Sequence, residues 1–298
     1  HGSGNAGNAF SYYTVAGDNN TLTVNAGKTV TFAPWSCFAF NSGAHSIASN
    51  LSQTINLYGT MTFVDGDLGG LLTANGWTGH TNNYFSMNVN NTATSTLNVY
   101  NGGVLNVSEF YPNGTNALNT PGVGNVVTMN VASGGKINVS KIADFRNAAQ
   151  TVTGGGEFNV LAGATLKIGA TSGITSSGTT GPVQTTTRGY NVGATYSYEG
   201  IASQVTGNGI PSNVSGLAVN NVTGVTLTSS ATVSGNLAFT AGNLITGSNS
   251  LTLGTAATIT GAGSTGWVVG PLSKQTATNA SPSFNFAIGD ATNYTPIA

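Results

Sequence analysis

One short cassette recurs four times along the chain. Each copy reads apolar-x-apolar-x-x-Gly-x-x-apolar-x-apolar, so two stretches of alternating apolar residues flank a glycine. The copies span residues 22–32, 97–107, 129–139 and 158–168, and a shorter relative spans 55–63. Alternation with a period of two predicts a strand, and the glycine marks a bend between two strands. Each cassette therefore predicts two short strands around a turn.

A two-strand unit of this kind cannot bury its apolar stripe by itself, so it must stack on copies of itself. The sequence therefore predicts an all-β fold, an elongated parallel β-helix (β-solenoid). From residue 190 the strand-like segments become shorter, and successive segments begin at Val225, Leu237 and Leu251. This tighter rhythm leaves a β-sandwich-like C-terminal part open as an alternative.

The cassettes and the segments between them predict four regions. Residues 1–20 form an N-terminal leader, a cap or an exchanged strand, and residues 21–170 form the solenoid with the glycine-bend cassettes. Residues 171–265 continue the solenoid with shorter repeats, and residues 266–298 begin a further β region. Because an uncovered solenoid end exposes unpaired strands, we expect the remainder of a longer chain or a partner to cover it.

The chain carries few charges. Only 5% of its 298 residues are charged and the net charge is −1, and its Lys and Arg residues are scattered. Nucleic-acid binding needs clustered cations, so we expect no nucleic-acid partner. No apolar run approaches the roughly 18 residues of a membrane-spanning helix. The first residue is His1 and no signal-like segment follows it, so we expect that any secretion signal has been removed.

The chain offers little for catalysis or metal binding. Its close carboxylate pair is Asp65 and Asp67, which supplies too few of the 6–8 oxygen ligands of Ca²⁺ without backbone help. Turn formation is therefore the favoured interpretation, and a Ca²⁺ site is the alternative. The three histidines and Cys37 lack metal-site spacing, and no nucleophile, phosphate-binding or dinucleotide-binding motif occurs. We predict no enzyme activity and no cofactor.

Aromatic residues suggest a contact surface. An exposed aromatic strip could stack on sugar rings or pack against a neighbouring subunit, while packing of loops over the coils is the alternative. The candidates are Tyr58, Trp77, Tyr84, Tyr100, Phe110 and Tyr111.

Polar residues recur between the apolar cassette positions. On stacked coils, equivalent asparagines would form amide ladders along the stack. The asparagines at these positions are Asn98, Asn106, Asn130, Asn138 and Asn159. Thr-x-Thr pairs such as Thr21/Thr23 and Thr60/Thr62 also raise ice binding as an alternative, which the irregular spacing of the pairs disfavours.

The last third of the chain resembles large secreted cell-surface proteins of the Bacteroidota, which are exported by the type IX route and described as adhesin-like. The resemblance rests on short repeat segments between residues 193 and 254 and on the Trp267–Leu272 segment. These segments include Tyr196-Ser197-Tyr198-Glu199-Gly200, Gly224-Val225-Thr226-Leu227 and Asn249-Ser250-Leu251-Thr252-Leu253-Gly254. The resemblance implies a β-solenoid displayed outside the cell and carries no catalytic motif over.

Two functions follow as hypotheses. The first is an extracellular structural or adhesive surface protein, displayed as a stalk or self-assembling into a filament or layer. Its partners would be copies of itself, the remainder of a longer chain or surface glycans. The second is a carbohydrate-binding or carbohydrate-cleaving β-helix, in which Asp65, Asp67, Asp144 and Glu157 would converge in one groove.

Overall fold

The computed structural model of the chain describes residues 10–12, 20–32, 38–40, 52–63, 84–86, 94–112, 126–278 and 283–298. Every regular element in these ranges is a β-strand. The chain divides into two compact units, which are described separately. Unit 1 comprises His1–Asp144, Gln150–Asn159 and Thr185–Thr187, and unit 2 comprises Phe145–Ala149, Val160–Gln184 and Arg188–Ala298.

Unit 1 is built from three stacks of parallel strands. The first stack is β2–β5–β8–β10–β12, the second is β3–β6–β9–β11, and the third is β1–β4–β7 with the C-terminal half of β9. The strands are β1 (Phe10–Tyr12), β2 (Asn20–Val24), β3 (Thr29–Phe32), β4 (Phe38–Phe40), β5 (Ser52–Leu57), β6 (Thr60–Phe63), β7 (Tyr84–Ser86), β8 (Thr94–Val99), β9 (Val104–Tyr111), β10 (Val126–Val131), β11 (Lys136–Phe145) and β12 (Val152–Val160).

Unit 2 repeats the three-stack arrangement. The stacks are β13–β15–β17–β19–β22, then the N-terminal parts of β17 and β19 with β21 and β24, and finally β16–β18–β20–β23–β25. The strands are β13 (Thr165–Ile168), β14 (Val183–Tyr190), β15 (Thr195–Tyr198), β16 (Gln204–Val205), β17 (Asn213–Asn220), β18 (Val225–Thr226), β19 (Ala231–Ala241), β20 (Leu244–Ile245), β21 (Leu251–Leu253), β22 (Thr258–Thr260), β23 (Val268–Val269), β24 (Leu272–Lys274) and β25 (Ile288–Gly289).

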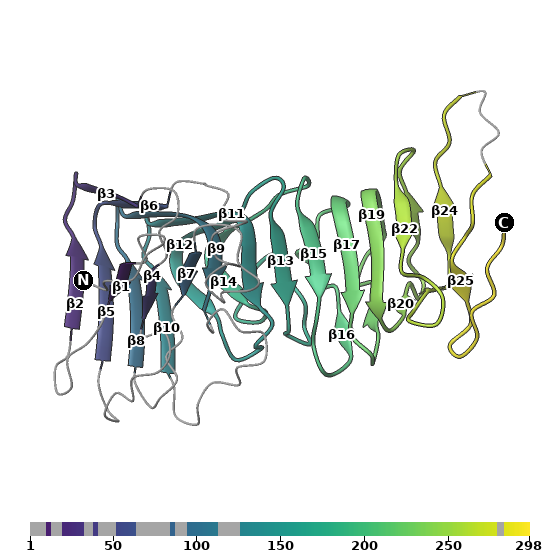
Figure 1. Cartoon of the computed structure of the whole chain (residues 1–298), viewed down its shortest axis with the longest axis horizontal. Coiled ribbons are helices and arrows are strands. Elements are labelled where there is room, and N and C mark those ends of the chain that lie inside the picture. Colours follow the sequence, from purple (N-terminus) through teal and green to yellow (C-terminus); the bar gives the residue numbers. More distant parts are fainter. Residues whose placement is uncertain are drawn as a thin grey trace, which may run out of the picture. The chain divides into compact units, whose positions relative to one another are not determined.

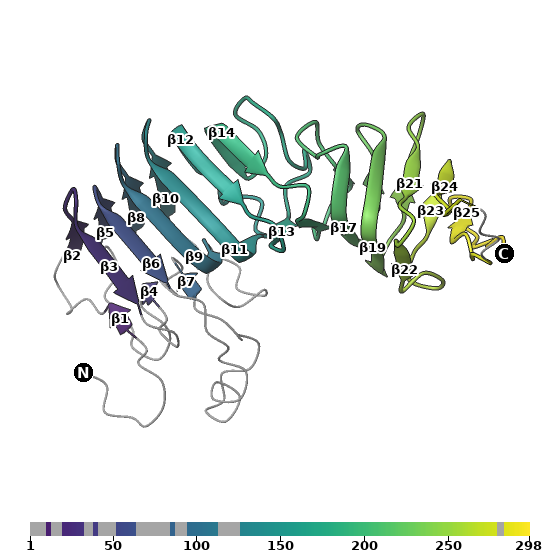
Figure 2. The same cartoon turned by 90° about the horizontal axis from the view of Figure 1, so that it is seen from above.

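Parallel pairing between successive coils confirms the predicted β-solenoid. Figure 1 shows β2, β5, β8 and β10 of unit 1 side by side, and likewise β13, β15, β17 and β19 of unit 2. Figure 2 shows the β3 and β6 stack of unit 1 from above. The sandwich alternative is wrong for the described residues after 190, because β24 and β25 pair in parallel with the coils before them. The shorter repeats make shorter coils.

Rows of apolar side chains fill the interior of each unit. In β8 the burial alternates strictly, with outward residues partly exposed and Ser95, Leu97 and Val99 buried. Pairing in register puts each inward residue on its counterpart in the next coil. Met61 and Leu105, which are such counterparts, are both 0% exposed. Burial of these rows is the main apolar contribution to stability, because burying a Leu or Met side chain is worth about 1.5–3 kcal/mol.

The cassette glycines form the predicted bends. Each has a positive φ, in the left-handed region that costs other residues about 1–2 kcal/mol. The values are 69° for Gly27, 80° for Gly102, 82° for Gly134 and 79° for Gly163. The glycine therefore sets the turn that separates the first stack from the second.

Two glycines of unit 2 distinguish the cost of an unfavourable backbone conformation from the cost of crowding an added side chain. Gly163 has φ 79° and nothing within 4 Å of an added Cβ, whereas in Gly207, with φ 81°, that Cβ would lie 2.0 Å from the Ile174 carbonyl oxygen. We expect Gly163→Ala to lower the free energy of unfolding by about 1–2 kcal/mol. Gly207→Ala adds a backbone clash and should cost about 1–3 kcal/mol more. Urea denaturation of both variants tests this, and equal losses would contradict it.

Candidate functional site

The outer surface of the first stack in unit 1 is an ordered array of hydroxyl and carboxamide groups, here called the hydroxyl–amide face. Its outward residues pair in register from coil to coil. In order along the strands, the described outward side chains are Thr94; then the row of Thr21, Thr54, Thr96 and Thr128; then the row of Thr23, Asn56, Asn98, Asn130 and Thr153. No charged or aromatic residue occurs in these rows, so the face offers only neutral hydrogen-bonding groups and methyl groups.

The asparagines of this face form the predicted amide ladder. Asn98 Nδ2 donates to Asn56 Oδ1 at 3.0 Å, and Asn130 Nδ2 donates to Asn98 Oδ1 at 3.2 Å. The hydroxyl of Thr153 donates to Asn130 Oδ1 at 3.1 Å and ends the ladder. Each amide is thereby fixed in orientation, so the face is rigid as well as regular.

A second ladder follows the neighbouring stack. Asn106 Nδ2 donates to the hydroxyl of Thr62 at 3.1 Å, and Asn138 Nδ2 donates to Asn106 Oδ1 at 2.8 Å. Asn159 Nδ2 then donates to Asn138 Oδ1 at 2.9 Å. All five asparagines predicted to form ladders therefore do so.

The irregular sequence spacing does not disturb these rows. Asn56 and Asn98 are 42 residues apart and Asn98 and Asn130 are 32 apart, yet both pairs are adjacent in register. The surplus residues lie between the strands. The expectation that irregular spacing disfavours an ordered Thr array is therefore wrong, because residues at unequal separations along the chain are adjacent in space.

Two of the candidate aromatic residues form a surface pair. The rings of Tyr58 and Tyr100 stack with centroids 4.2 Å apart and planes 2° from parallel. Each follows the last residue of its strand in the first stack, and Tyr58 is 39% exposed. These two tyrosines could contact a ligand or a neighbouring protein.

Other candidates are not on the surface. Phe110 is 0% exposed and stacks with Phe85 at 5.9 Å, and Tyr111 is 4% exposed and donates to Glu109 Oε2 at 2.7 Å. The expected exposure of both residues is wrong, because the C-terminal half of β9 joins the third stack and turns them inward. Trp77, the side chain of Tyr84, and the Asp65 and Asp67 pair lie outside the described residues, as does Cys37.

Four ionisable side chains form two ion pairs within the protein. Lys136 Nζ lies 3.3 Å from Glu157 Oε2, and Arg146 Nε lies 3.6 Å from Glu199 Oε2. Asp144 is 6% exposed, so Asp144 and Glu157 do not form an open pair of acid and base groups. Among the described residues, no three His, Cys, Asp or Glu side chains gather to hold a metal ion.

Asp290 is held by its own turn. Its carboxylate accepts hydrogen bonds from the backbone N–H of Thr292 and of Asn293, both at 2.7 Å. These two backbone bonds, followed by bonds from the Asn293 and Thr292 side chains, hold the pKa of Asp290 well below its ordinary value. Asp290 therefore stays ionised and shapes the loop.

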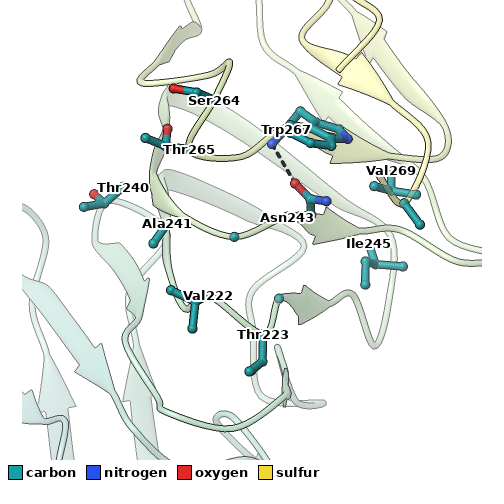
Figure 3. A pocket seen from close by; sticks show the side chains of 13 residues that line it. Val222, Thr223, Thr240, Ala241, Asn243, Ile245, Ser264, Thr265, Trp267 and Val269 are labelled. Carbon is teal, nitrogen blue, oxygen red and sulfur yellow. Dashed lines mark hydrogen bonds between the residues drawn. The ribbon is translucent and has the colours of Figure 1, made fainter. Parts of the chain in front are cut away.

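A cavity of about 660 Å³ opens on unit 2 (Figure 3). Three successive coils supply its wall, through the segments around Val222, Asn243 and Trp267. Asn243 Oδ1 accepts a hydrogen bond from the backbone N–H of Trp267 at 3.1 Å. The sites predicted from the sequence do not include this cavity. Its signal was the recurrence of Gly242-Asn243 and Gly266-Trp267 at the same corner of successive coils.

A buried tyrosine cluster should make the stability of unit 2 depend on pH. Burial raises the pKa of Tyr198 well above its ordinary value, and Tyr196 and Tyr190 raise it further. The Tyr198 hydroxyl donates to the Thr206 carbonyl at 2.8 Å. An unfolded tyrosine ionises near pH 10, so this stabilisation is complete below pH 10 and is lost as the pH rises above it. We expect the urea midpoint to fall between pH 9 and pH 11, and to fall less in Tyr198→Phe. Equal slopes would contradict this.

Comparisons with known proteins give no relative. No protein-family model, no curated protein and no solved structure matches the chain. In the part of the chain that the structure describes, no helix is long and apolar enough to cross a membrane.

Proposed function

We propose that this protein is an extracellular structural or adhesive protein of the cell surface, acting as a stalk or assembling into a filament or layer, without catalysis. The observation that carries the proposal is the pair of side-chain ladders in unit 1. They use outward polar groups to fix successive coils to one another, and two ion pairs, Lys136–Glu157 and Arg146–Glu199, form within the chain. An uncharged polar surface of this kind repels other copies of the protein little, so it is compatible with a protein displayed on a cell surface that makes repeated weak contacts.

The first coil offers a place for self-association. Within the described residues, β2 pairs only with β5 and β3 pairs only with β6. Val30, on β3, is 37% exposed, while Met61, its partner in the next coil, is 0% exposed. An unpaired strand edge beside an apolar side chain can accept a strand from another copy.

The test is the assembly state of the full chain. Light scattering over a range of concentrations and electron microscopy should show filaments or higher assemblies. Val30→Lys should weaken assembly at least tenfold, because it places a charge at the open edge. Leu161→Lys is the matched control, since Leu161 is 39% exposed but lies at a turn. A protein that stays monomeric and does not attach to cells contradicts the proposal.

The hydroxyl–amide face supports a second candidate, binding to ice. Strand separation and residue rise place its groups at intervals of about 4.8 Å across the strands and about 6.7 Å along them. An uncharged array of hydroxyl, methyl and amide groups with two fixed repeats can order water in a lattice.

Incorporation into a slowly grown ice mass tests this candidate. The parent protein should be enriched in the ice, and Thr96→Lys should abolish the enrichment because it interrupts the central row. Thr171→Lys, at an exposed turn of unit 2, should not change it. Exclusion of the parent protein from ice would refute ice binding and leave the structural role standing.

A further inference from the structure

One side of the unit 2 cavity is apolar. Ile245, Val269 and the indole of Trp267 contribute to this wall, and Figure 3 shows Ile245 and Val269 together on one side. The indole is held in place, because Nε1 of Trp267 donates to the Asp290 carbonyl at 2.8 Å and the ring lies 5.8 Å from that of Tyr294. With its N–H already used, Trp267 can offer a fixed ring for stacking.

The opposite side is lined by neutral hydrogen-bonding groups. Figure 3 shows Thr240, Ser264 and Thr265 there, across the cavity from Ile245 and Val269. In the described part of the chain, the hydroxyls of Thr240 and Ser264 make no hydrogen bond. Asn243 uses only its oxygen, so its Nδ2 group has two hydrogens to donate.

The cavity wall contains no Asp, Glu, Lys, Arg or His. An anionic ligand would therefore find no countercharge, and a wholly apolar ligand would leave the hydroxyls and the Asn243 amide without partners. A ligand that combines C–H faces with neutral hydroxyls satisfies both walls. The volume of about 660 Å³ lies within the usual range for small-molecule sites, about 300–1,000 Å³.

Two exposed apolar residues, Val222 and Ile201, are here called the apolar shelf. Val222 lines the cavity and is 79% exposed, and Ile201 is 96% exposed. Ile201 lies three residues before Gln204, and Val222 lies three residues before Val225, the strand partner of Gln204 in the following coil. A ligand longer than the cavity could lay a second apolar face along this shelf.

We propose that this cavity binds the end of a neutral saccharide chain. Trp267 stacks on the C–H face of the terminal sugar, Asn243 Nδ2 and the hydroxyls of Thr240 and Ser264 bond its hydroxyl groups, and Val222 and Ile201 support the following sugar. The site is distinct from the carboxylate groove expected from the sequence. It does not depend on the proposed structural role, because binding here requires no self-association.

Fluorine NMR of the full chain labelled with fluorotryptophan tests this proposal. The chain has three tryptophans, so a Trp267→Phe variant assigns the Trp267 signal. The probes are neutral hexose and N-acetylhexosamine monosaccharides and disaccharides, with glucuronic acid and sialyllactose as anionic comparisons. We expect a saturable shift of the Trp267 signal with at least one neutral sugar and none with the anionic sugars.

Two matched asparagine variants distinguish the loss of a ligand contact from a general effect of an Asn→Asp substitution on folding. Asn243→Asp retains the oxygen that accepts from Trp267 but removes the Nδ2 donor, so it should weaken binding at least tenfold. Asn236→Asp, whose side chain bonds Thr258 and Thr260, should leave binding unchanged. The proposal is overturned if no neutral sugar shifts the Trp267 signal, if anionic sugars bind equally well, or if Asn243→Asp binds as well as the parent.

Discussion

Phe110→Ala should lower the free energy of unfolding by about 3–5 kcal/mol, the usual cost of removing a fully buried aromatic ring. Phe110 is 0% exposed and lies between Phe85, at 5.9 Å, and Phe158, at 5.8 Å. Its removal leaves a cavity in the middle of a row of rings that runs from coil to coil. Urea denaturation followed by circular dichroism measures the loss.

Tyr100→Ala is the control for this prediction. Tyr100 is partly exposed and contacts the Tyr58 ring at the surface, so its removal should cost about 0.5–1.5 kcal/mol. A Phe110→Ala variant no less stable than Tyr100→Ala would show that the third stack is not packed as described. The comparison is informative because both residues were equally good surface candidates in the sequence.

Asn138→Ala should cost about 2 kcal/mol. Asn138 is the partly buried centre of the second ladder, where it donates to Asn106 at 2.8 Å and accepts from Asn159 at 2.9 Å. Each bond contributes about 1 kcal/mol net, and the substitution also leaves both neighbouring amides without their partner. Thermal unfolding monitored by circular dichroism measures the effect.

Asn130→Ala provides the matched comparison. It also removes two ladder bonds, but Asn130 is exposed and its bonds are longer, at 3.2 and 3.1 Å. Because water can replace them, the loss should be below about 1 kcal/mol. Equal losses for the two variants would mean that ladder bonds contribute independently of burial, against this prediction.

The cassette predicted the fold because two independent signals coincide in it. The alternation around Leu97 and Met129 specifies which side chains face inward, and the glycine bend fixes where the chain turns. A register slip of one residue would move the apolar row to the surface, so the alignment of cassettes gave the pairing of strands. The β-sandwich alternative for the C-terminal region was wrong, since shorter segments are compatible with both a sandwich and a shorter coil.

The candidate surfaces were less predictable. Phe110 and Tyr111 are adjacent in the chain and both are buried, so alternation fails where β9 passes from the second stack to the third. The cavity beside Trp267 draws on residues of three coils, so the recurrence of Gly242-Asn243 and Gly266-Trp267 does not by itself mark a site. Local pattern fixes the facing of a side chain within a strand, but corners and assembled cavities depend on tertiary packing.

The central claim is that irregular spacing along the chain conceals a constant register in space, and cysteine cross-linking tests it most directly. In a Cys37→Ser background, Thr54→Cys/Thr96→Cys and Thr96→Cys/Thr128→Cys join residues that face one another on adjacent strands. The separation of about 4.8 Å suits a disulfide, which needs Cα atoms about 4.4–6.8 Å apart. Thr96→Cys/Asn130→Cys is the control, since these residues lie about 8 Å apart diagonally.

Oxidation followed by mass spectrometry gives the result. The account predicts that both in-register pairs close without loss of thermal stability, although their separations in sequence differ, and that the diagonal pair stays open. If the diagonal pair closes as readily as the others, or if neither in-register pair closes, the coils are not stacked in this register and the account is wrong.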